Sequence, residues 1–414
     1  MHSKGRTILN STIEIIRQVF PPHCHRLVFL VGGSVRDHLL GREIRDIDLA
    51  AALAPAQLRA AGFRLVEGKS TDPIWFASNP SFGTIELTAL ADTPLLDADL
   101  VRRDFTVNAM AMDLSGRLID PLGGRGDLEA GLLRACTKRT FADDPLRIFR
   151  AFRFEADGWR LSDDTGELIR SQDWSGSFET IPVERFSREM VKALSAPHPE
   201  RFFRDMLEYG VGRQYLPELF RMGGVPAGPL AHHPEGDLCT HSLQVLERLS
   251  SHSDSPLARF CALFHDIGKL ATDPSEYPAH HRHCLSGFDM ARPFNHRLRL
   301  PAAFGTALAW TSLLHGHLNR WSELRDSTRI TTVEKAVKGG IAGILPLVSA
   351  ADKGAEGEPA DWTEIMRIVR MNTTRLGIEP DRLTSIPAPQ RPDLILQRRI
   401  EYLRRHRCAN QPEG

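Results

Sequence analysis

The chain has 414 residues, and its 52 Lys and Arg balance its 52 Asp and Glu, so the formal net charge at pH 7 is zero. This length exceeds one ordinary core and predicts two to four domains. No run of about 18 apolar residues occurs, which argues against a membrane span. The first residues lack a signal-peptide pattern and the six cysteines lie far apart. We therefore expect a reduced, cytoplasmic protein.

Zero net charge at first argues against a nucleic-acid partner, because phosphate binding normally requires a basic surface. The arginines, however, are clustered: they lie at 102–103, at 147, 150 and 153, at 201 and 204, and in the stretch "QRRIEYLRRHR" at 397–407. Basic surface can thus be local while the overall charge is balanced.

The predicted elements change character along the chain. From Arg26 to about Arg139, short β-branched runs alternate with Gly and Pro, which predicts a strand-rich head. After "DDPLR" the apolar spacing is helical. We expect an α+β protein with four segments: a head at 1–140, a helical neck and body at 141–225, a His-rich helical block at 226–355 and a helical tail at 356–414.

The stretch "LVGGSVRDHLLGREIRDIDLA" from Leu30 to Ala50 holds the first candidate site. A turn at Gly32 and Gly33 lets backbone N–H groups approach a triphosphate. Asp46 and Asp48 stand two apart, so on a strand both carboxylates share a face and repel each other unless cations neutralise them. Two Mg²⁺ ions would do so, although an isolated Asp-x-Asp is more often a solvated turn.

The whole pattern resembles the class II tRNA nucleotidyltransferases and bacterial poly(A) polymerases of the polymerase β superfamily. The resemblance implies a mixed-sheet head in which Asp46 and Asp48 are catalytic Mg²⁺ ligands. Glu86 in "TIELTA" is similar to the third carboxylate of the family, an exposed strand residue being the equal alternative. The stretch "RRDFTVNAMA" resembles the next family motif. The nucleotide-binding residues implied in the head are Gly32, Gly33, Arg36, Arg102, Arg103, Asp104 and Asn108.

The stretch "FADDPLRIFRAFRFEA" predicts a helix that Asp144 caps and Pro145 opens, with arginines at every third position on one side. It resembles the family motif Glu-Asp-x-x-Arg. The resemblance implies that Asp144 and Arg147 read the incoming base, and that Arg150 and Arg153 bind the nucleotide. A carboxylate can accept from the amino group of C or A, which uracil lacks. Asp143 replaces the usual Glu of the family.

The segment "ELTALADTPLLDADLVRRD" is short and, before Arg102, contains neither Arg nor Gly. Family members that build the whole C-C-A end usually have a flexible, Gly- and Arg-containing loop here, which reshapes the pocket from C to A. A shortened loop marks enzymes that stop after C-C and leave A to a separate enzyme. We therefore expect addition of C-C to tRNA from CTP, with full C-C-A addition from CTP and ATP as the alternative.

In the His-rich block, "THSLQVLERL" and "FCALFHDIGK" resemble the HD phosphohydrolase superfamily. The resemblance implies the metal ligands His241, His265, Asp266 and Asp352. Such a donor set suits Ni, Mn, Fe or Mg. Four further histidines could complete a second metal position, although each alone is more often a surface or capped residue: His280, His281, His283 and His315. In nucleotidyltransferases with such a block, phosphatase or cyclic phosphodiesterase activity at RNA ends is implied.

Two rival functions are weaker. A bacterial poly(A) polymerase has the same head but usually lacks an HD block and carries a longer basic tail. An HD hydrolase whose head only binds nucleotide would be expected to have lost Asp46 or Asp48, and both are present. The order of head, neck, HD block and tail is like that of the HD-containing bacterial subgroup, and we expect the tail to contact tRNA.

Overall fold

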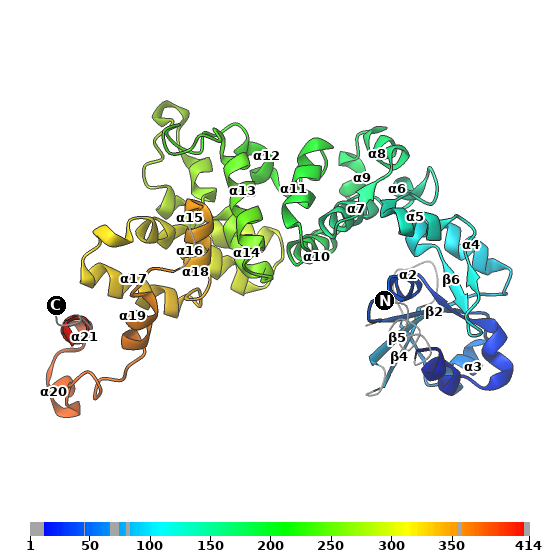
Figure 1. Ribbon diagram of the computed structural model, residues 1–414, viewed down its shortest axis with the longest axis horizontal. Coiled ribbons are helices and arrows are strands. Elements are labelled where there is room, and N and C mark those ends of the chain that lie inside the picture. The colour runs from blue at the N-terminus through cyan, green and yellow to red at the C-terminus, as the bar shows by residue number, and fades with distance from the viewer. Residues whose placement is uncertain (1–11, 45, 67–73, 80–82, 355–357, 410–414) are drawn as a thin grey trace. The chain divides into compact units, whose positions relative to one another are not determined.

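The chain forms two compact units, residues 1–178 and 179–414, in a computed structural model that describes residues 12–44, 46–66, 74–79, 83–354 and 358–409 (Figure 1). Among these residues, no helix has the length and apolar character needed to cross a membrane. Mixed strands and helices make up the first unit, whereas the second is helical in its described part.

A seven-stranded sheet in the order β3-β4-β5-β2-β1-β6-β7 organises the first unit. Its strands are β1 Val28–Val31, β2 Ile47–Ala51, β3 Arg64–Val66, β4 Ile74–Asn79, β5 Gly83–Ala89, β6 Ala111–Asp113 and β7 Leu118–Ile119. The central strand β1 is buried at every position, which is why its sequence, VFLV, is apolar throughout instead of alternating. A second, two-stranded sheet pairs β8 Leu132–Leu133 with β9 Arg160–Leu161.

Strand pairing places two carboxylates side by side. β2 and β5 are parallel neighbours, and their register sets Asp48 opposite Glu86. Directly opposed residues on adjacent strands project to the same face of a sheet. The sheet therefore brings together two acids that are far apart in the sequence.

The helices of the first unit are α2 Gly33–Leu39, α3 Pro55–Ala60, α4 Leu95–Val101, α5 Gly124–Ala130, α6 Thr140–Asp143, α7 Leu146–Ala156, α8 Asp163–Arg170 and α9 Ser175–Phe178. α7 buries Phe149 and Phe152, each contributing roughly 1.5–3 kcal/mol through burial. Phe149 packs on Phe178 with ring centroids 5.0 Å apart. Its arginines at every third position lie outside this apolar face, as predicted.

The helices of the second unit are α10 Val183–Leu194, α11 Pro199–Glu208, α12 Pro217–Met222, α13 Leu238–Ser250, α14 Pro256–Phe264, α15 His283–Arg297, α16 Ala302–Asn319, α17 Asp326–Lys338, α18 Leu345–Lys353, α19 Trp362–Val369, α20 Pro380–Ser385 and α21 Arg391–Ala409. α13, α14, α15, α16 and α18 pack on one another and surround a buried group of histidines and carboxylates. An apolar shell around such a group makes the burial of each charge costly unless it is paired.

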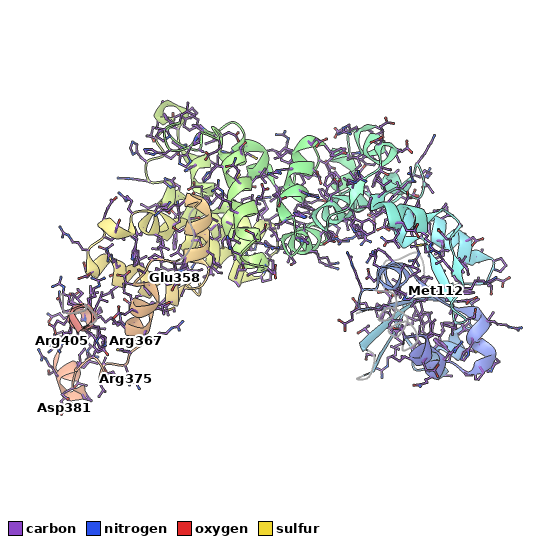
Figure 2. All side chains as sticks on the ribbon, viewed as in Figure 1. Met112, Glu358, Arg367, Arg375, Asp381 and Arg405 are labelled. Atoms are coloured by element: carbon purple, nitrogen blue, oxygen red, sulfur yellow. The ribbon has the colours of Figure 1, made fainter. Side chains whose placement is uncertain are left out.

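Several arginines of α21 are used to hold the tail in place. Arg404 and Arg407 both pair with Asp326 of α17, at 3.1 and 2.7 Å. In contrast, Arg367, Arg375 and Arg405 are exposed (Figure 2). The basic composition of the tail thus serves packing as well as surface charge.

Candidate active site and metal centre

A polar cavity of about 610 Å³ opens beside β2 and β5 in the first unit. It is lined by Val31, Asp48, Leu49, Glu86, Thr88, Asp99, Arg102, Arg103, Asp143, Arg147 and Arg150. Six predicted site residues, two carboxylates and four arginines, meet here. Acids on one wall and guanidinium groups nearby suit a substrate that carries both phosphates and bound cations.

The carboxylates of this cavity are held in a way that favours a cation. Burial and the neighbouring Glu86 carboxylate raise the pKa of Asp48 to about 6. Burial also raises the pKa of Glu86, with Asp46 adding to the effect. Asp46 itself is exposed, directly before β2. An all-oxygen donor set whose negative charges disfavour one another fits Mg²⁺.

The Gly-Gly turn connects β1 to α2 and brings Arg103 close to Asp48. Gly32 has φ +66°, and a Cβ there would lie 2.5 Å from Nη1 of Arg103. The hydroxyl of Ser34 donates to the carbonyl of Asp46 and accepts from the N–H of Asp48, both at 2.9 Å. The start of α2 is thereby fastened to the start of β2, which orients both aspartates.

Gly32→Ala tests this close approach against Gly41→Ala, a matched control with φ +68° and open space around its Cβ. Alanine is strained at either position because φ is positive, and more so at Gly32, whose ψ of −132° lies outside the left-handed helical region, but only the first displaces Arg103. If Arg103 donates to the triphosphate, its loss corresponds to about 10- to 100-fold. We expect that fall in kcat/KM for nucleotide incorporation with Gly32→Ala and near-unchanged incorporation with Gly41→Ala. Equal effects of the two would refute the role.

Asp99 of α4 is a site residue that the sequence analysis missed. It is 4% exposed, and it pairs with Arg103 at 2.9 Å and with Arg102. Burial alone would raise the pKa of Asp99, but Arg103 and Arg102 hold it below its usual range. The available signal was an Asp three and four residues before two arginines on a helical pattern. One carboxylate thus orients both arginines in the cavity.

The remaining predicted head residues form a network beside the cavity. Nη1 of Arg36 donates to Oδ1 of Asn108 at 2.6 Å, and Nδ2 of Asn108 donates to Oδ1 of Asp104 at 3.0 Å. Nε of Arg150 donates to the other oxygen of Asp104 at 2.9 Å. Although burial acts to raise it, the pKa of Asp104 is held well below its usual range by Arg150 and Asn108. Asp104 therefore stays charged and fixes the arginines around it.

The arginines of α7 have different partners. Arg147 donates to the carbonyl oxygens of Arg102 and Arg103, at 2.8 and 3.3 Å. Arg153 pairs with Asp157 at 3.1 Å and lies over the ring of Phe154, 4.2 Å from its centroid. Arg147 thus ties the start of α7 to the segment that carries the two cavity arginines.

Asp144 occupies the junction between α6 and α7. Its Oδ1 accepts from the N–H of Leu146 at 3.2 Å, but α7 begins at Leu146 and Pro145 takes the N-cap position, one residue later than predicted. Its neighbour Asp143 lines the cavity and pairs with Arg139 at 3.1 Å.

The HD segment forms a second site inside the second unit. Nε2 of His241 lies 3.1 Å from Oδ1 of Asp352 and 4.0 Å from Oδ2 of Asp266. Nε2 of His265 lies 3.4 Å from Oδ2 of Asp266 and 3.7 Å from Oδ1 of Asp352. The four predicted metal ligands therefore converge on one point; they come from α13, from the two residues after α14 and from α18.

Two of the four further histidines join this site. Nε2 of His283 and Nε2 of His315 lie 3.4 and 3.3 Å from Oδ1 of Asp266. His280 instead bonds the carbonyl of Pro226 at 2.7 Å, and His281 is exposed. Asp266 is thus shared between two pairs of histidines.

Each of the four converging histidines has its Nδ1 already engaged. The partners are Oε1 of Glu235 for His241, and the carbonyls of Ala262 for His265, His280 for His283 and Ser312 for His315, at 2.7, 2.8, 2.7 and 3.0 Å. A ring that donates through Nδ1 keeps the lone pair on Nε2 for a metal.

Three buried atoms at the centre lack a hydrogen-bond partner: Nε2 of His241, Nε2 of His265 and Oδ1 of Asp266. Such atoms are costly in a protein interior unless a ligand satisfies them. Lys269 pairs with the other oxygen of Asp266 and partly balances its charge. The nitrogen and carboxylate donors fit a divalent metal ion.

Comparison with known proteins supports both sites. Residues 28–88 and 82–134 match the poly A polymerase head domain, residues 161–222 match the probable RNA and SrmB-binding site of polymerase A, and residues 238–338 match the HD domain. A protein of Methylococcus capsulatus named "Multifunctional CCA protein" is 35% identical over 415 residues, covering 93% of this chain and 96% of the relative. The chain belongs to the tRNA nucleotidyltransferase family of the multifunctional CCA proteins.

A further relative supports this membership, and solved structures share the fold. A multifunctional CCA protein of Halorhodospira halophila is 38% identical over 362 residues, covering 81% of this chain and 85% of that protein. The Thermotoga maritima CCA-adding enzyme complexed with tRNA has the same fold, with a TM-score of 0.65, 18% identity and coverage of 96% and 94%. The Bacillus stearothermophilus CCA-adding enzyme in complex with CTP gives a TM-score of 0.62 and 23% identity, with coverage of 94% of this chain and 89% of that one.

These comparisons confirm the predicted family and fold class, and the chain is a nucleotidyltransferase with an HD domain. They do not support the expected restriction to C-C, nor a separate A-adding enzyme, because the relatives are named CCA proteins. The prediction rested on a shortened loop before Arg102. That segment instead forms α4, whose Asp99 clamps two cavity arginines. The division into four segments remains a prediction.

Proposed function

We propose that this enzyme adds C, C and A to the 3′ end of tRNA from CTP and ATP without a nucleic-acid template. The observation that carries the proposal is the cavity in which Asp48 and Glu86 meet four arginines. The names of the relatives support full C-C-A addition over C-C addition alone. The tRNA 3′ oxygen would form a bond to the α-phosphorus while the bond to pyrophosphate breaks in line.

Asp46 and Asp48 would hold Mg²⁺, with Glu86 as a further ligand. The ion supplies activation of the 3′ hydroxyl and neutralisation of the triphosphate when bound. Backbone N–H groups at Gly32 and Gly33 would approach the phosphates at the start of α2. Guanidinium groups would neutralise their charge; the residues proposed for this are Arg36, Arg102, Arg103, Arg150 and Arg153, with Asp104 and Asn108 positioning them.

Asp144 and Arg147 would select the base. A carboxylate accepts from the amino group of C or A, and a guanidinium donates to ring acceptors, so uracil is rejected. The contacts of Arg147 with the carbonyls of Arg102 and Arg103 support this assignment, because they link the base-reading position to the phosphate-binding arginines. A movement of Arg147 would therefore also move Arg102 and Arg103.

Incubation of the purified chain with two tRNA substrates tests the function. With tRNA that lacks C-C-A, we expect CTP alone to add two nucleotides. With tRNA that ends in C-C, we expect ATP to add one nucleotide and UTP none. Failure to add A would restore the C-C alternative, and long A tracts on unrelated RNA would identify a poly(A) polymerase.

For the HD site we propose hydrolysis of phosphate monoesters or cyclic phosphodiesters at RNA 3′ ends. The convergence of His241, His265, Asp266 and Asp352, with unsatisfied buried atoms at the centre, supports this second activity. The donors suit Ni, Mn, Fe or Mg. Hydrolysis of a cyclic phosphodiester or a phosphate monoester at the tRNA 3′ end would leave the free 3′ hydroxyl that the head requires.

Exposed arginines of the tail are proposed to contact tRNA. Arg367, Arg375 and Arg405 are exposed, and guanidinium groups can bind phosphates without reading sequence (Figure 2).

A further inference from the structure

One of the two carboxylate oxygens of Asp352 is already occupied by a protein group. Nδ2 of Asn319 donates to Oδ2 of Asp352 at 2.7 Å, whereas Oδ1 of Asp352 lies 3.1 Å from Nε2 of His241. The side chain of Asp352 is only 9% exposed, so this contact is largely shielded from water. The two oxygens of one carboxylate therefore have different partners.

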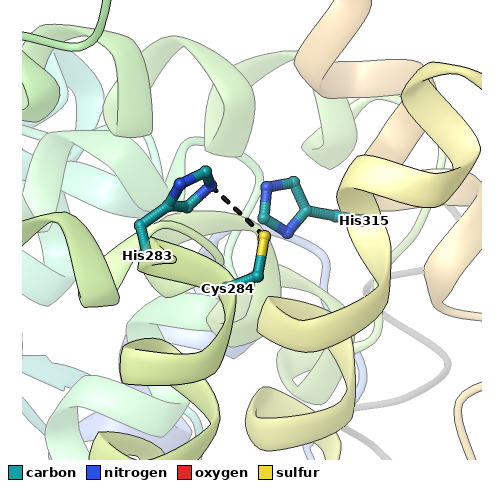
Figure 3. A group of neighbouring side chains, drawn as sticks. All are labelled: His283, Cys284 and His315. Carbon is teal, nitrogen blue, oxygen red and sulfur yellow. Dashed lines mark hydrogen bonds between the residues drawn. The ribbon is translucent and has the colours of Figure 1, made fainter. Parts of the chain in front are cut away.

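Asn319 belongs to a helix that also carries a histidine of the site. It is the last residue of α16, one turn after His315, which Figure 3 shows beside His283 and Cys284 of α15. α16 packs on α18, whose last turn carries Asp352. The packing of these two helices thus brings the amide of Asn319 to the carboxylate of Asp352.

The orientation of the Asn319 amide follows from its two partners. An ionised carboxylate accepts hydrogen bonds and donates none, so the NH₂ group of Asn319 must face Asp352. The amide oxygen then accepts from Oγ of Ser349, at 2.9 Å. Ser349 is buried and stands one turn before Asp352 on α18. The amide is held from both sides, and turning it away from Oδ2 of Asp352 would break both hydrogen bonds.

The backbone that carries Asp352 is fixed by a different residue. Nη1 of Arg248 donates to the carbonyl oxygens of Ala351 and Asp352, at 2.6 and 3.2 Å. Arg248 lies on α13, the helix that also carries His241. With the backbone held, rotation of the carboxylate is the main freedom left to Asp352, and the hydrogen bond from Asn319 restricts it.

A carboxylate with one oxygen held by the protein binds a metal ion through the other oxygen alone. Ca²⁺ takes about six to eight oxygen ligands and often uses both oxygens of a carboxylate, whereas imidazole suits Ni²⁺. His241 and His265 supply imidazole nitrogens next to Oδ1 of Asp352. With Asp352 restricted to one oxygen, the site offers fewer oxygen donors than Ca²⁺ prefers.

We propose that Asn319 determines the metal selectivity of the HD site, because it holds Oδ2 of Asp352 and leaves Oδ1 as the one oxygen of that ligand. Asn319 is a positioning residue, which acts through Asp352 and does not itself touch the metal. Its presence disfavours Ca²⁺ relative to Ni²⁺. The proposal rests on the HD site being a metal centre, which is part of the proposed function.

Competition between Ni²⁺ and Ca²⁺ for the full chain tests the proposal. The chain carries Asp48→Asn, which removes a carboxylate of the head site, and is freed of metal by a chelator. Equilibrium dialysis with radioactive Ni²⁺ in increasing Ca²⁺ gives both dissociation constants. The HD equivalent is the bound Ni²⁺ that His265→Asn abolishes.

Asn319→Leu removes the donor and nearly keeps the size of the side chain. We expect the affinity for Ni²⁺ to fall about 10- to 100-fold, as for other partners of metal ligands. The affinity for Ca²⁺ should stay or rise, because Oδ2 of Asp352 becomes free to bind. The ratio of the two dissociation constants should therefore shift toward Ca²⁺ by at least about 10-fold.

Two further variants guard against a merely structural effect. Ser349→Ala keeps Asn319 but frees its amide, and should shift the ratio in the same direction by a smaller factor. The matched control is Asn372→Leu, at an exposed residue whose Oδ1 accepts from the N–H of Arg375. It should leave both affinities unchanged.

The outcomes separate this role from the metal centre itself. If both ions weaken equally in Asn319→Leu and Ser349→Ala leaves the ratio unchanged, the metal centre stands and the selectivity role is refuted. Loss of Ni²⁺ in Asn319→Leu without easier displacement by Ca²⁺ in either variant also refutes it. If Ni²⁺ binding does not depend on His265, the metal centre fails, and this proposal fails with it.

Discussion

Asp48→Asn is expected to lower nucleotide incorporation into tRNA at least about 1000-fold, because several kcal/mol of transition-state stabilisation by the bound cation would be lost. Asp48 is the half-buried carboxylate opposite Glu86, and desolvation together with Glu86 raises its pKa to about 6. The amide keeps the shape of the side chain but removes the negative charge that holds the ion. Single-turnover incorporation of CTP into tRNA lacking C-C-A measures the effect.

Asp97→Asn is the matched control, because it makes the same chemical change at an exposed position of α4. It should incorporate CTP at the rate of the unchanged chain. Both variants should keep the melting temperature of the parent within a few degrees. Incorporation by Asp48→Asn within about 10-fold of the parent would correspond to less than 1.4 kcal/mol and would remove Asp48 from the metal site.

Replacing His265 with asparagine should lower phosphoester hydrolysis by the HD site at least about 100-fold. Mutation of residues that merely support metal ligands already lowers metal affinity or activity about 10- to 100-fold. His265 is 1% exposed and its Nε2 points at Asp266 and Asp352. Release of phosphate from an RNA 3′-phosphate or a 2′,3′-cyclic phosphate measures this. Incorporation of CTP should persist, because the head lies in the other compact unit.

His252→Asn provides the control, since His252 is exposed at the end of α13. It should retain hydrolysis. Because a buried substitution can unfold the domain, Asp352→Asn, at a ligand position that also accepts a hydrogen bond from Asn319, gives a second test. Hydrolysis that survives in both ligand variants would exclude this site as its source.

The strands and helices of the head were largely predictable from local patterns. The apolar runs before Gly32 and around Ile85 become β1 and β5, and α7 begins directly after Asp144 and Pro145, one residue later than predicted. β6, Ala111–Asp113, was not predicted, because three residues following a nucleotide-binding motif carry too little alternation. Sheet order depends on long-range pairing, so no local pattern contains it.

The short segment before Arg102 is where a family pattern and the relatives favour different products. Absence of Gly and Arg between Glu86 and Arg102 predicted an enzyme that stops after C-C, yet the relatives are CCA proteins. The absence of Gly and Arg from a segment does not tell which structure the segment forms. Here the segment contains α4, and Asp99 fixes two arginines through i,i+3 and i,i+4 contacts, which helical geometry creates.

By itself the sequence determined the chemical inventory: the Asp46 and Asp48 pair, the spaced arginines and the His265-Asp266 dipeptide are local, and their spacing sets which face each side chain occupies. The tertiary structure alone decided which distant residues complete each site. Register between β2 and β5 sets Glu86 opposite Asp48, and packing of α15 and α16 brings His283 and His315 to Asp266. Close packing and strand pairing join residues far apart in the chain, and neither leaves a short-range signal in the sequence.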